Sequence, residues 1–227
     1  MAYRYGCTRG PEDASASRPD ARERIQQAAI ELYGEHGFEA TSLKAIAERA
    51  EVSAPLVLHH FGSKAGLRTA CDQRAAEHLR QAKLEAVRRQ GSLPQNYLFE
   101  VMSQNLPLVR YMLRAFAAGG RGADALMDQL VEDSLEYTAE AEALGQVVSS
   151  RNPEHRAALL LMMSFGSMMM HHQMKRLLGV SPVEDPPEEW GPYIAAVSEI
   201  YLYGVLRPEA YPDLVAFIDD HRKGRDR

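Results

Sequence analysis

Apolar residues recur along most of this chain at intervals of three or four positions, the spacing that places side chains on one face of an α-helix. Ile25, Ala29 and Leu32 form the first such face. No stretch combines sustained strand alternation with hairpin turns at its ends. The pattern therefore predicts an all-α protein.

Capping residues and helix breakers divide the pattern into segments. Residues 1–19, rich in Gly, Ser, Pro and charge, are expected to be a disordered arm. Short helices should follow from residue 20 to the Gly34–Gly37 region, from residue 43, and from 54 to about 60. Later helices are expected over 64–90, 94–106, 107–118, 122–148, 153–179, 188–206 and 211–220.

Residues 41–64, TSLKAIAERAEVSAPLVLHHFGSK, have the layout of a helix-turn-helix. Ala47 is small where a second helix must cross closely, and Val52 fills the core after the turn. Ser53 can cap the next helix, which Val57 anchors underneath. The positions left for a DNA major groove are Ser53, Ala54, Pro55, Leu58 and His59.

Residues 22–68 resemble the DNA-binding domain of the tetracycline-repressor (TetR) family of bacterial transcription regulators. The resemblance is carried by RIQQAAIELYGEHGFEATSLKAIAERAEVS and LHHFGSKAGL. It implies an N-terminal three-helix helix-turn-helix domain over 20–68 and a C-terminal helical domain for effector binding and dimerisation over 69–227. It also implies phosphate contacts by Thr41, Ser42, His60 and Lys64, close to helix starts that attract anions.

Two positions depart from the family pattern. The family usually has glycine at the turn where this chain has Glu51. A left-handed backbone costs a non-glycine residue about 1 kcal/mol, so we expect this turn to be built differently. Leu58 replaces a tyrosine that commonly contacts a phosphate, and we expect it to meet a thymine methyl or a sugar instead.

The C-terminal region resembles the family in length and helicity only. The resemblance implies a homodimer formed by the helices predicted over 153–179 and 188–206. Small residues on the first helix and an apolar stripe on the second suit that interface, namely Ser164 and Ser167, and Ile194, Val197 and Tyr201. Packing within one subunit explains the stripe equally well.

An effector pocket is expected among apolar and Met-rich positions of the same region, because methionine suits adaptable binding surfaces. The candidate lining residues are Tyr97, Met102, Arg110, Tyr111, Arg114, Phe116, Met127, Tyr137, Met163, Phe165 and Met169. The two arginines, four positions apart, could receive an acidic ligand, although a solvated face explains them as well.

A metal site is not expected, and neither is any other cofactor. The methionines from 162 to 174 lie beside His171 and His172. Consecutive residues of a helix point in different directions, so the adjacent histidines should chelate one ion poorly. No phosphate-binding loop, G-x-S-x-G or H-E-x-x-H motif is present, which argues against an enzyme.

Charge refines this interpretation. The chain has 26 Lys and Arg against 31 Asp and Glu, and this formal charge of −5 by itself argues against a nucleic-acid-binding protein. Residues 1–90 nevertheless hold 14 basic and 12 acidic residues, whereas 91–227 hold 12 and 19. Two cysteines, a 14-residue apolar maximum and no leader-like N-terminus predict a cytoplasmic protein without a membrane span.

We therefore expect a homodimeric regulator that binds a double-stranded DNA operator and a small hydrophobic or amphipathic effector, most simply as a repressor. Control by a protein partner and activation of transcription are the alternatives within the same class. An enzyme or binding protein with a vestigial DNA-binding domain is the alternative from another class.

Overall fold

The computed structural model describes the backbone of residues 20–89 and 95–223, and side chains over 20–89 and 105–218. Every regular element in these ranges is helical, as the sequence predicts. The elements are α1 (Ala21–His36), α2 (Leu43–Arg49), α3 (Ala54–Phe61), α4 (Lys64–Arg88), α5 (Gln95–Ala118), α6 (Arg121–Ala143), α7 (Pro153–Met169), α8 (His171–Leu178), η1 (Pro187–Glu189), α9 (Gly191–Tyr203), η2 (Pro208–Ala210) and α10 (Pro212–Lys223). The predicted arm, 1–19, lies outside the described residues.

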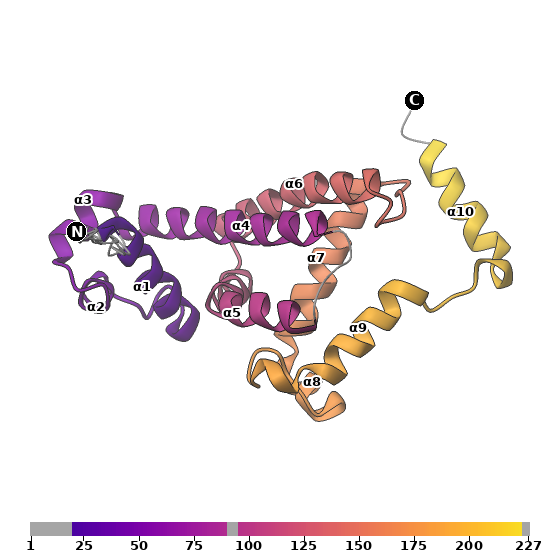
Figure 1. The fold of residues 1–227 in the computed structure, drawn as a ribbon. Coiled ribbons are helices and arrows are strands. Elements are labelled where there is room, and N and C mark those ends of the chain that lie inside the picture. Colours follow the sequence, from indigo (N-terminus) through magenta and orange to yellow (C-terminus); the bar gives the residue numbers. More distant parts are fainter. Residues whose placement is uncertain (1–19, 90–94, 224–227) are drawn as a thin grey trace, which may run out of the picture.

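The N-terminal unit consists of α1, α2, α3 and the start of α4, at one end of the molecule (Figure 1). Its core is apolar and fully buried, with Ile25 from α1, Ile46 from α2, Val57 from α3 and Leu67 from α4. These residues occupy the inner face that the three-and-four spacing predicts. The N-terminal unit therefore has its own apolar core, formed entirely by residues of one chain.

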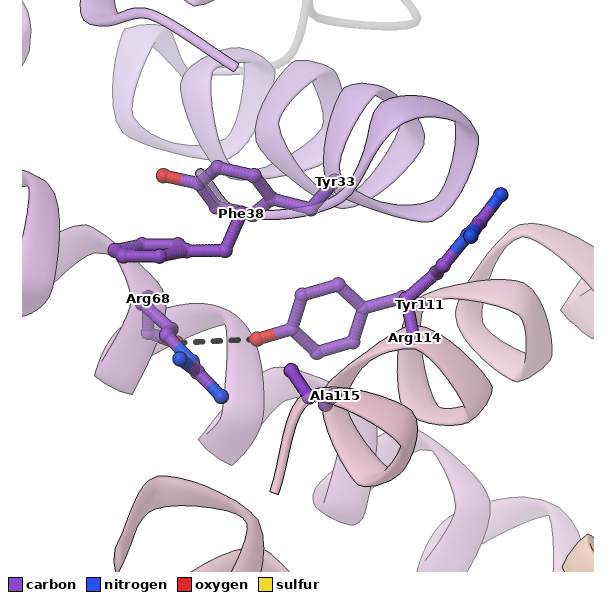
Figure 2. A pocket seen from close by; sticks show the side chains of 7 residues that line it. Tyr33, Phe38, Arg68, Tyr111, Arg114 and Ala115 are labelled. Atoms are coloured by element: carbon purple, nitrogen blue, oxygen red, sulfur yellow. Dashed lines mark hydrogen bonds between the residues drawn. The ribbon is translucent and has the colours of Figure 1, made fainter. Parts of the chain in front are cut away.

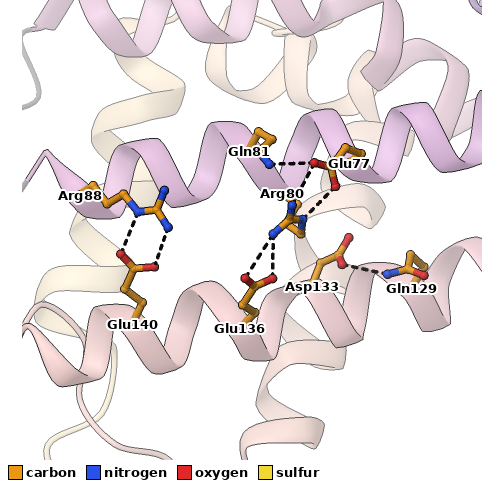
Figure 3. A network of polar contacts seen from close by, with 8 residues as sticks. All are labelled: Glu77, Arg80, Gln81, Arg88, Gln129, Asp133, Glu136 and Glu140. Carbon is orange, nitrogen blue, oxygen red and sulfur yellow. Dashed lines mark hydrogen bonds and ion pairs between the residues drawn. The ribbon is translucent and has the colours of Figure 1, made fainter.

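Helix α4 connects this unit to the rest of the molecule, the body, and packs along α6 (Figure 3). Two ion pairs join the helices: Arg80 meets Glu136 at 2.9 Å and Arg88 meets Glu140 at 3.0 Å. Arg80 also pairs with Glu77, one turn earlier on α4. Because the pairs are partly solvated, they set the register of α4 on α6 more than they add stability.

Helices α1 and α5 form a second connection between the N-terminal unit and the body. They cross closely at Gly34, where a methyl group on the glycine would lie only 3.2 Å from the backbone nitrogen of Tyr111 and 3.4 Å from Cβ of Arg110. Arg114 reaches back toward the carbonyl oxygens of Gly34 and Glu35, at 3.4 and 3.5 Å. The end of α1 is thus held directly against α5.

Several predicted helix boundaries were wrong. Helix α5 continues through Pro107, because burial of Tyr111, Met112 and Ala115 beyond it compensates for the hydrogen bond that proline cannot make. Helix α6 ends at Ala143, where Gly145 takes a left-handed conformation and Gln146 N–H bonds back to the carbonyl of Ala141. The helix predicted over 153–179 is two helices that meet at Met170.

The C-terminal helices project from the body (Figure 1). Within the described residues, α10 packs closely only on the η2 turn that precedes it. Large apolar side chains from residue 200 onward are exposed, among them Leu202, Tyr203 and Val205. Among the helices of the described ranges, none has the length and apolar character needed to cross a membrane.

Candidate nucleic-acid interface

The turn between α2 and α3 keeps the left-handed backbone that glycine would favour. Glu51 adopts φ 55°, and no other non-glycine residue in the described ranges has a positive φ. Val52 N–H then bonds to the carbonyl of Ala47 at 2.9 Å, which closes the turn. The expectation of a differently built turn was therefore wrong, because the surrounding helix contacts outweigh the local cost of about 1 kcal/mol.

The outer face of α3 points to solvent. Val57 is buried beneath it, whereas Ser53, Pro55, Leu58 and His59 are exposed, and Ala54 is half-buried. Ser53 occupies the cap position but its side chain makes no capping bond, so its hydroxyl remains available to a ligand. Leu58 is 45% exposed on this outer face, so its side chain is open to contact with a groove.

The side chain of Thr41 is unavailable to a phosphate, contrary to expectation. It is 3% exposed, and its hydroxyl lies 2.8 Å from the carbonyl oxygen of Gly37 and 3.2 Å from that of Leu32. A short hydroxyl placed between two carbonyls fastens the end of α1 to the start of α2. Ser42, in contrast, is exposed and caps α2 by accepting the N–H of Ala45 at 3.1 Å.

Lys64 lies on an aromatic surface that the sequence reasoning did not find. Its ammonium sits 4.4 Å from the centre of the Phe38 ring and 3.4 Å from the carbonyl oxygen of Glu39. Arg68, one turn later, stacks on the same ring at 4.9 Å. Phe38 therefore positions two cations at the start of α4. Two cationic residues four positions apart can be recognised in the sequence. Only the fold shows that the Phe38 ring lies beside them.

His60 is half-buried on the last turn of α3. Its ring lies 5.7 Å from the ring of His59 and 6.2 Å from that of Phe61. Ser42 is thus exposed and His60 and Lys64 are half-buried, whereas Thr41 is buried against the end of α1.

A small recess, with a cavity volume of about 20 Å³, lies where α1, α4 and α5 meet (Figure 2). Tyr111 and Arg114 of the predicted pocket line it, together with Tyr33, Phe38 and Arg68. Among the described residues the hydroxyl of Tyr33 is buried without a hydrogen-bond partner. The recess therefore lies at the junction between the N-terminal unit and the body, and not within the body.

Tyr111 anchors this junction through the half-buried carboxyl group of Asp72. Its hydroxyl donates to Asp72 at 2.6 Å. Burial raises the pKa of Asp72, and the hydrogen bond from Tyr111 and the charge of Arg68 oppose that rise. Burial likewise raises the pKa of Tyr33 and of Tyr111, so both hydroxyl groups stay protonated.

The remaining predicted pocket residues do not converge. Phe116 and Phe165 pack edge to face at 4.9 Å within the core, whereas Met163 and Met169 are exposed. Met127 and Tyr137 are half-buried on α6. Arg110 donates to the carbonyl oxygen of Val183 at 2.7 Å. The side chains of Tyr97 and Met102 lie outside the described residues.

A second recess, with a cavity volume of about 80 Å³, lies between α6 and α7. Its lining includes Leu135, Thr138, Ala157 and Leu160, with the Glu142–Arg156 ion pair at its edge. None of the predicted pocket residues belongs to it. This recess is the larger of the two and lies within the body.

The predicted interface residues lie on α7 and α9. Ser164 and Ser167 are half-buried and donate to carbonyls of their own helix, at 2.8 Å each. Ile194 and Val197 are half-buried, and Tyr201 is exposed. The α9 stripe is therefore only partly covered by its own chain.

Comparison with known families gives two matches that follow each other along the chain. Residues 25–71 match the family described as bacterial regulatory proteins of the tetR family. Residues 103–206 match the family described as the tetracyclin repressor-like C-terminal domain. The first match covers α1–α3 and the start of α4, and the second ends before α10.

Curated relatives and solved structures agree with these matches. The chain is 40% identical over 156 residues to the HTH-type transcriptional regulatory protein RaaS of Mycobacterium tuberculosis, covering 68% of this chain and 72% of that protein. It is 29% identical to the HTH-type transcriptional repressor KstR of Mycolicibacterium smegmatis, over 52% of this chain and 61% of that one. The fold is similar to a TetR-family regulator from a Rhodococcus species (TM-score 0.57, 16% identity, 80% of this chain and 98% of that one). It is also similar to PfmR of Thermus thermophilus (TM-score 0.52, 22% identity, 81% and 100%).

Proposed function

We propose, since the chain belongs to the TetR family of bacterial transcription regulators, that it is a homodimeric repressor released from its operator by a small hydrophobic or amphipathic effector. Residues 20–68 would form the DNA-binding domain and 69–227 the effector-binding and dimerisation domain, with α4 shared by both. The protein would act in the cytoplasm on double-stranded DNA. The observation that carries this proposal is the solvent-facing side of α3 behind a closed helix-turn-helix turn.

Base recognition is assigned to the exposed face of α3. Ser53 and His59 offer hydrogen-bonding groups to base edges, and Leu58 offers an apolar contact for a thymine methyl. Ala54 and Pro55 keep this face narrow enough to approach the groove. Ser42, His60 and Lys64 would bind phosphates and set the register of α3 on the duplex.

Two variants separate these roles in a gel-shift or fluorescence-anisotropy titration with DNA flanking the protein's own gene. Lys64→Ala should weaken binding to all sequences alike and reduce the salt dependence by about one ion per subunit. His59→Ala should instead change the preference among single-base operator variants. Arg176→Ala removes the same charge from exposed α8, and DNA binding should not change.

The two variants also give the outcome that contradicts the assignment. Equal effects of Lys64→Ala and His59→Ala on every sequence would mean that the two residues share one role. Binding that shows neither salt dependence nor sequence preference would contradict the regulator itself.

Dimerisation would place one recognition helix on each operator half-site, about one helical turn of DNA apart. The proposed interface is the α7 and α9 face that includes Ser164, Ser167, Ile194, Val197 and Tyr201. Small serines on α7, with hydroxyls bonded to their own helix, allow a partner helix to approach closely without leaving a polar group unpaired. Sedimentation of the full chain tests the dimer directly.

Release of the operator would depend on the two connections between body and DNA-binding unit. The recess between α6 and α7 is smaller than an effector, so an effector that enters it would have to widen it and shift α6. The Arg80 and Arg88 ion pairs would carry that shift to α4 (Figure 3). The close crossing at Gly34 keeps α1 on α5, so the N-terminal unit would turn as a whole. The effector must bind the turned state more tightly than the operator-bound state. The ratio of these two effector affinities sets the factor by which the effector can lower operator affinity.

A further inference from the structure

Two adjacent histidines and a glutamate converge where α7 meets α8. Nδ1 of His171 lies 2.5 Å, and Nδ1 of His172 3.0 Å, from the same carboxylate oxygen of Glu184. The two imidazole rings are 4.0 Å apart, and the three ligand atoms lie within 4.8 Å of one another. The expectation that the two histidines diverge was wrong, because the helix is interrupted at Met170 (φ −92°, ψ 30°) just before them.

Independent contacts hold Glu184 in this position. The neighbouring Asp185 accepts Nζ of Lys175 at 2.6 Å and the N–H of Ser181 at 2.7 Å. Its carbonyl accepts the indole N–H of the buried Trp190 at 2.9 Å. The loop from 181 to 190 is therefore fastened at several points, and the carboxylate does not depend on the histidines for its place.

We propose that His171, His172 and Glu184 form a binding site for a divalent transition-metal ion such as Zn²⁺. Two imidazole nitrogens and a carboxylate oxygen are a donor set that such ions prefer. Bonds of about 2.0–2.2 Å in tetrahedral geometry require ligand atoms about 3.3 Å apart, so the two histidine–carboxylate distances need to lengthen by less than about 1 Å. The His172 side chain is 78% exposed, which leaves the fourth position open to water or to an outside ligand.

The ion would also act on the DNA-binding unit. Val183, next to Glu184, accepts a hydrogen bond from Arg110 of α5, and Cβ of Arg110 lies against Gly34 of α1. A metal ion that repositions Glu184 would move Val183 with it, and Arg110 would carry that displacement to the crossing of α1 and α5 at Gly34. This consequence rests on the proposed DNA-binding function, whereas metal binding does not.

The test uses the full, tag-free chain after dialysis against a chelator, titrated with Co²⁺ by visible absorption and with Zn²⁺ by calorimetry. One ion should bind per chain, with the d–d bands of a tetrahedral or five-coordinate Co²⁺ site. His171→Ala, His172→Ala and Glu184→Gln should each weaken binding at least tenfold. His78→Ala, which removes an exposed histidine from α4, should bind the ion as the wild type does.

Each outcome decides the proposal. Absence of saturable binding, or equal binding by the Glu184→Gln and wild-type chains, would overturn it and leave Glu184 as a hydrogen-bond acceptor for two imidazoles. Saturable binding without any change in operator affinity would overturn the coupling through Arg110 but not the site. Absence of operator binding by the wild-type chain, both with and without the ion, would contradict the proposed function instead.

Discussion

The two ends of the molecule treat their apolar side chains in opposite ways. In the N-terminal unit, Ile25, Ile46, Val57 and Leu67 from four different helices are buried against one another. Beyond residue 200, apolar side chains such as Leu202 and Tyr203 face solvent. The first region has a core that is complete within one chain, whereas the second leaves its apolar side chains exposed.

The largest expected effect is on the buried core of the N-terminal unit. Ile46→Ala leaves a cavity in a fully buried site and should lower the free energy of unfolding of the N-terminal unit by about 2–5 kcal/mol. Leu202→Ala, at a side chain that is 74% exposed, should change the stability of one chain by less than about 0.5 kcal/mol. Urea denaturation followed by circular dichroism measures both. Fluorescence of Trp190, the single tryptophan, reports on the body separately.

The next effect concerns the exposed apolar side chains of α9 in the C-terminal region. Tyr201→Asp places a charge on the α9 face and should raise the dimer dissociation constant roughly 30-fold, about 2 kcal/mol, because the carboxylate would have to lose its water. Glu199→Ala on another face of the same helix is the control, and its dissociation constant should match that of the wild type. An unchanged dimer in both variants would exclude α9 from the interface.

A smaller effect tests the turn within the compact end. Glu51→Gly removes the steric cost of the left-handed backbone and should stabilise the N-terminal unit by about 1 kcal/mol. Glu48→Gly, three residues earlier inside α2, should destabilise it by about 1 kcal/mol, because there glycine only adds unfolded-state entropy. Thermal unfolding of the two variants should therefore shift in opposite directions. A lower Tm for Glu51→Gly would mean that the Glu51 side chain contributes more than its backbone costs.

The smallest effect concerns pH at the junction between the two regions. A carboxyl group whose folded pKa is raised binds its proton more readily in the folded state, so Asp72 destabilises the chain above that pKa. This penalty disappears as the pH falls toward the unfolded pKa of about 3.9. Asp72→Asn should therefore be more stable than the wild type near pH 8, by no more than about 1 kcal/mol, and the gap should close near pH 4.

Glu77 provides the opposite sign on the same helix. Hydrogen bonds from Arg80 and Gln81 lower the pKa of Glu77 to about 2. Its contribution to stability is present above the unfolded pKa of about 4.3 and is lost as the pH falls toward 2. Glu77→Gln should accordingly lose stability relative to the wild type at neutral pH and match it in acid. The same pH dependence in both variants would contradict the assignment of Asp72 as the buried group.

Local pattern predicted the N-terminal unit well because neighbouring residues decide it. The helix starts at Leu43, Ala54 and Lys64 follow from caps and spacing that the sequence displays. The exposed side of α3 follows from the burial of Val57 on the opposite face. Thr41 was misassigned because its spacing marks a helix start equally well whether the hydroxyl points outward or toward the carbonyl of Leu32.

The body was predicted less well because distant contacts decide it. Pro107 reads as a break, yet packing of α5 on α1 carries the helix through it. The pocket residues were chosen by type, and type does not distinguish Phe165 in the core from Met163 on the surface.

The sequence by itself determined an all-α chain with a DNA-reading unit at its start, because helix periodicity and caps act within a few residues. Only the tertiary structure decided which cations lie on the Phe38 ring and where α1 crosses α5 at Gly34. It also decided that the side chains of His171, His172 and Glu184 lie close together. Those arrangements join residues that are between 1 and 77 positions apart along the chain. They depend on how whole helices pack, and a local pattern of apolar and polar residues does not encode that packing.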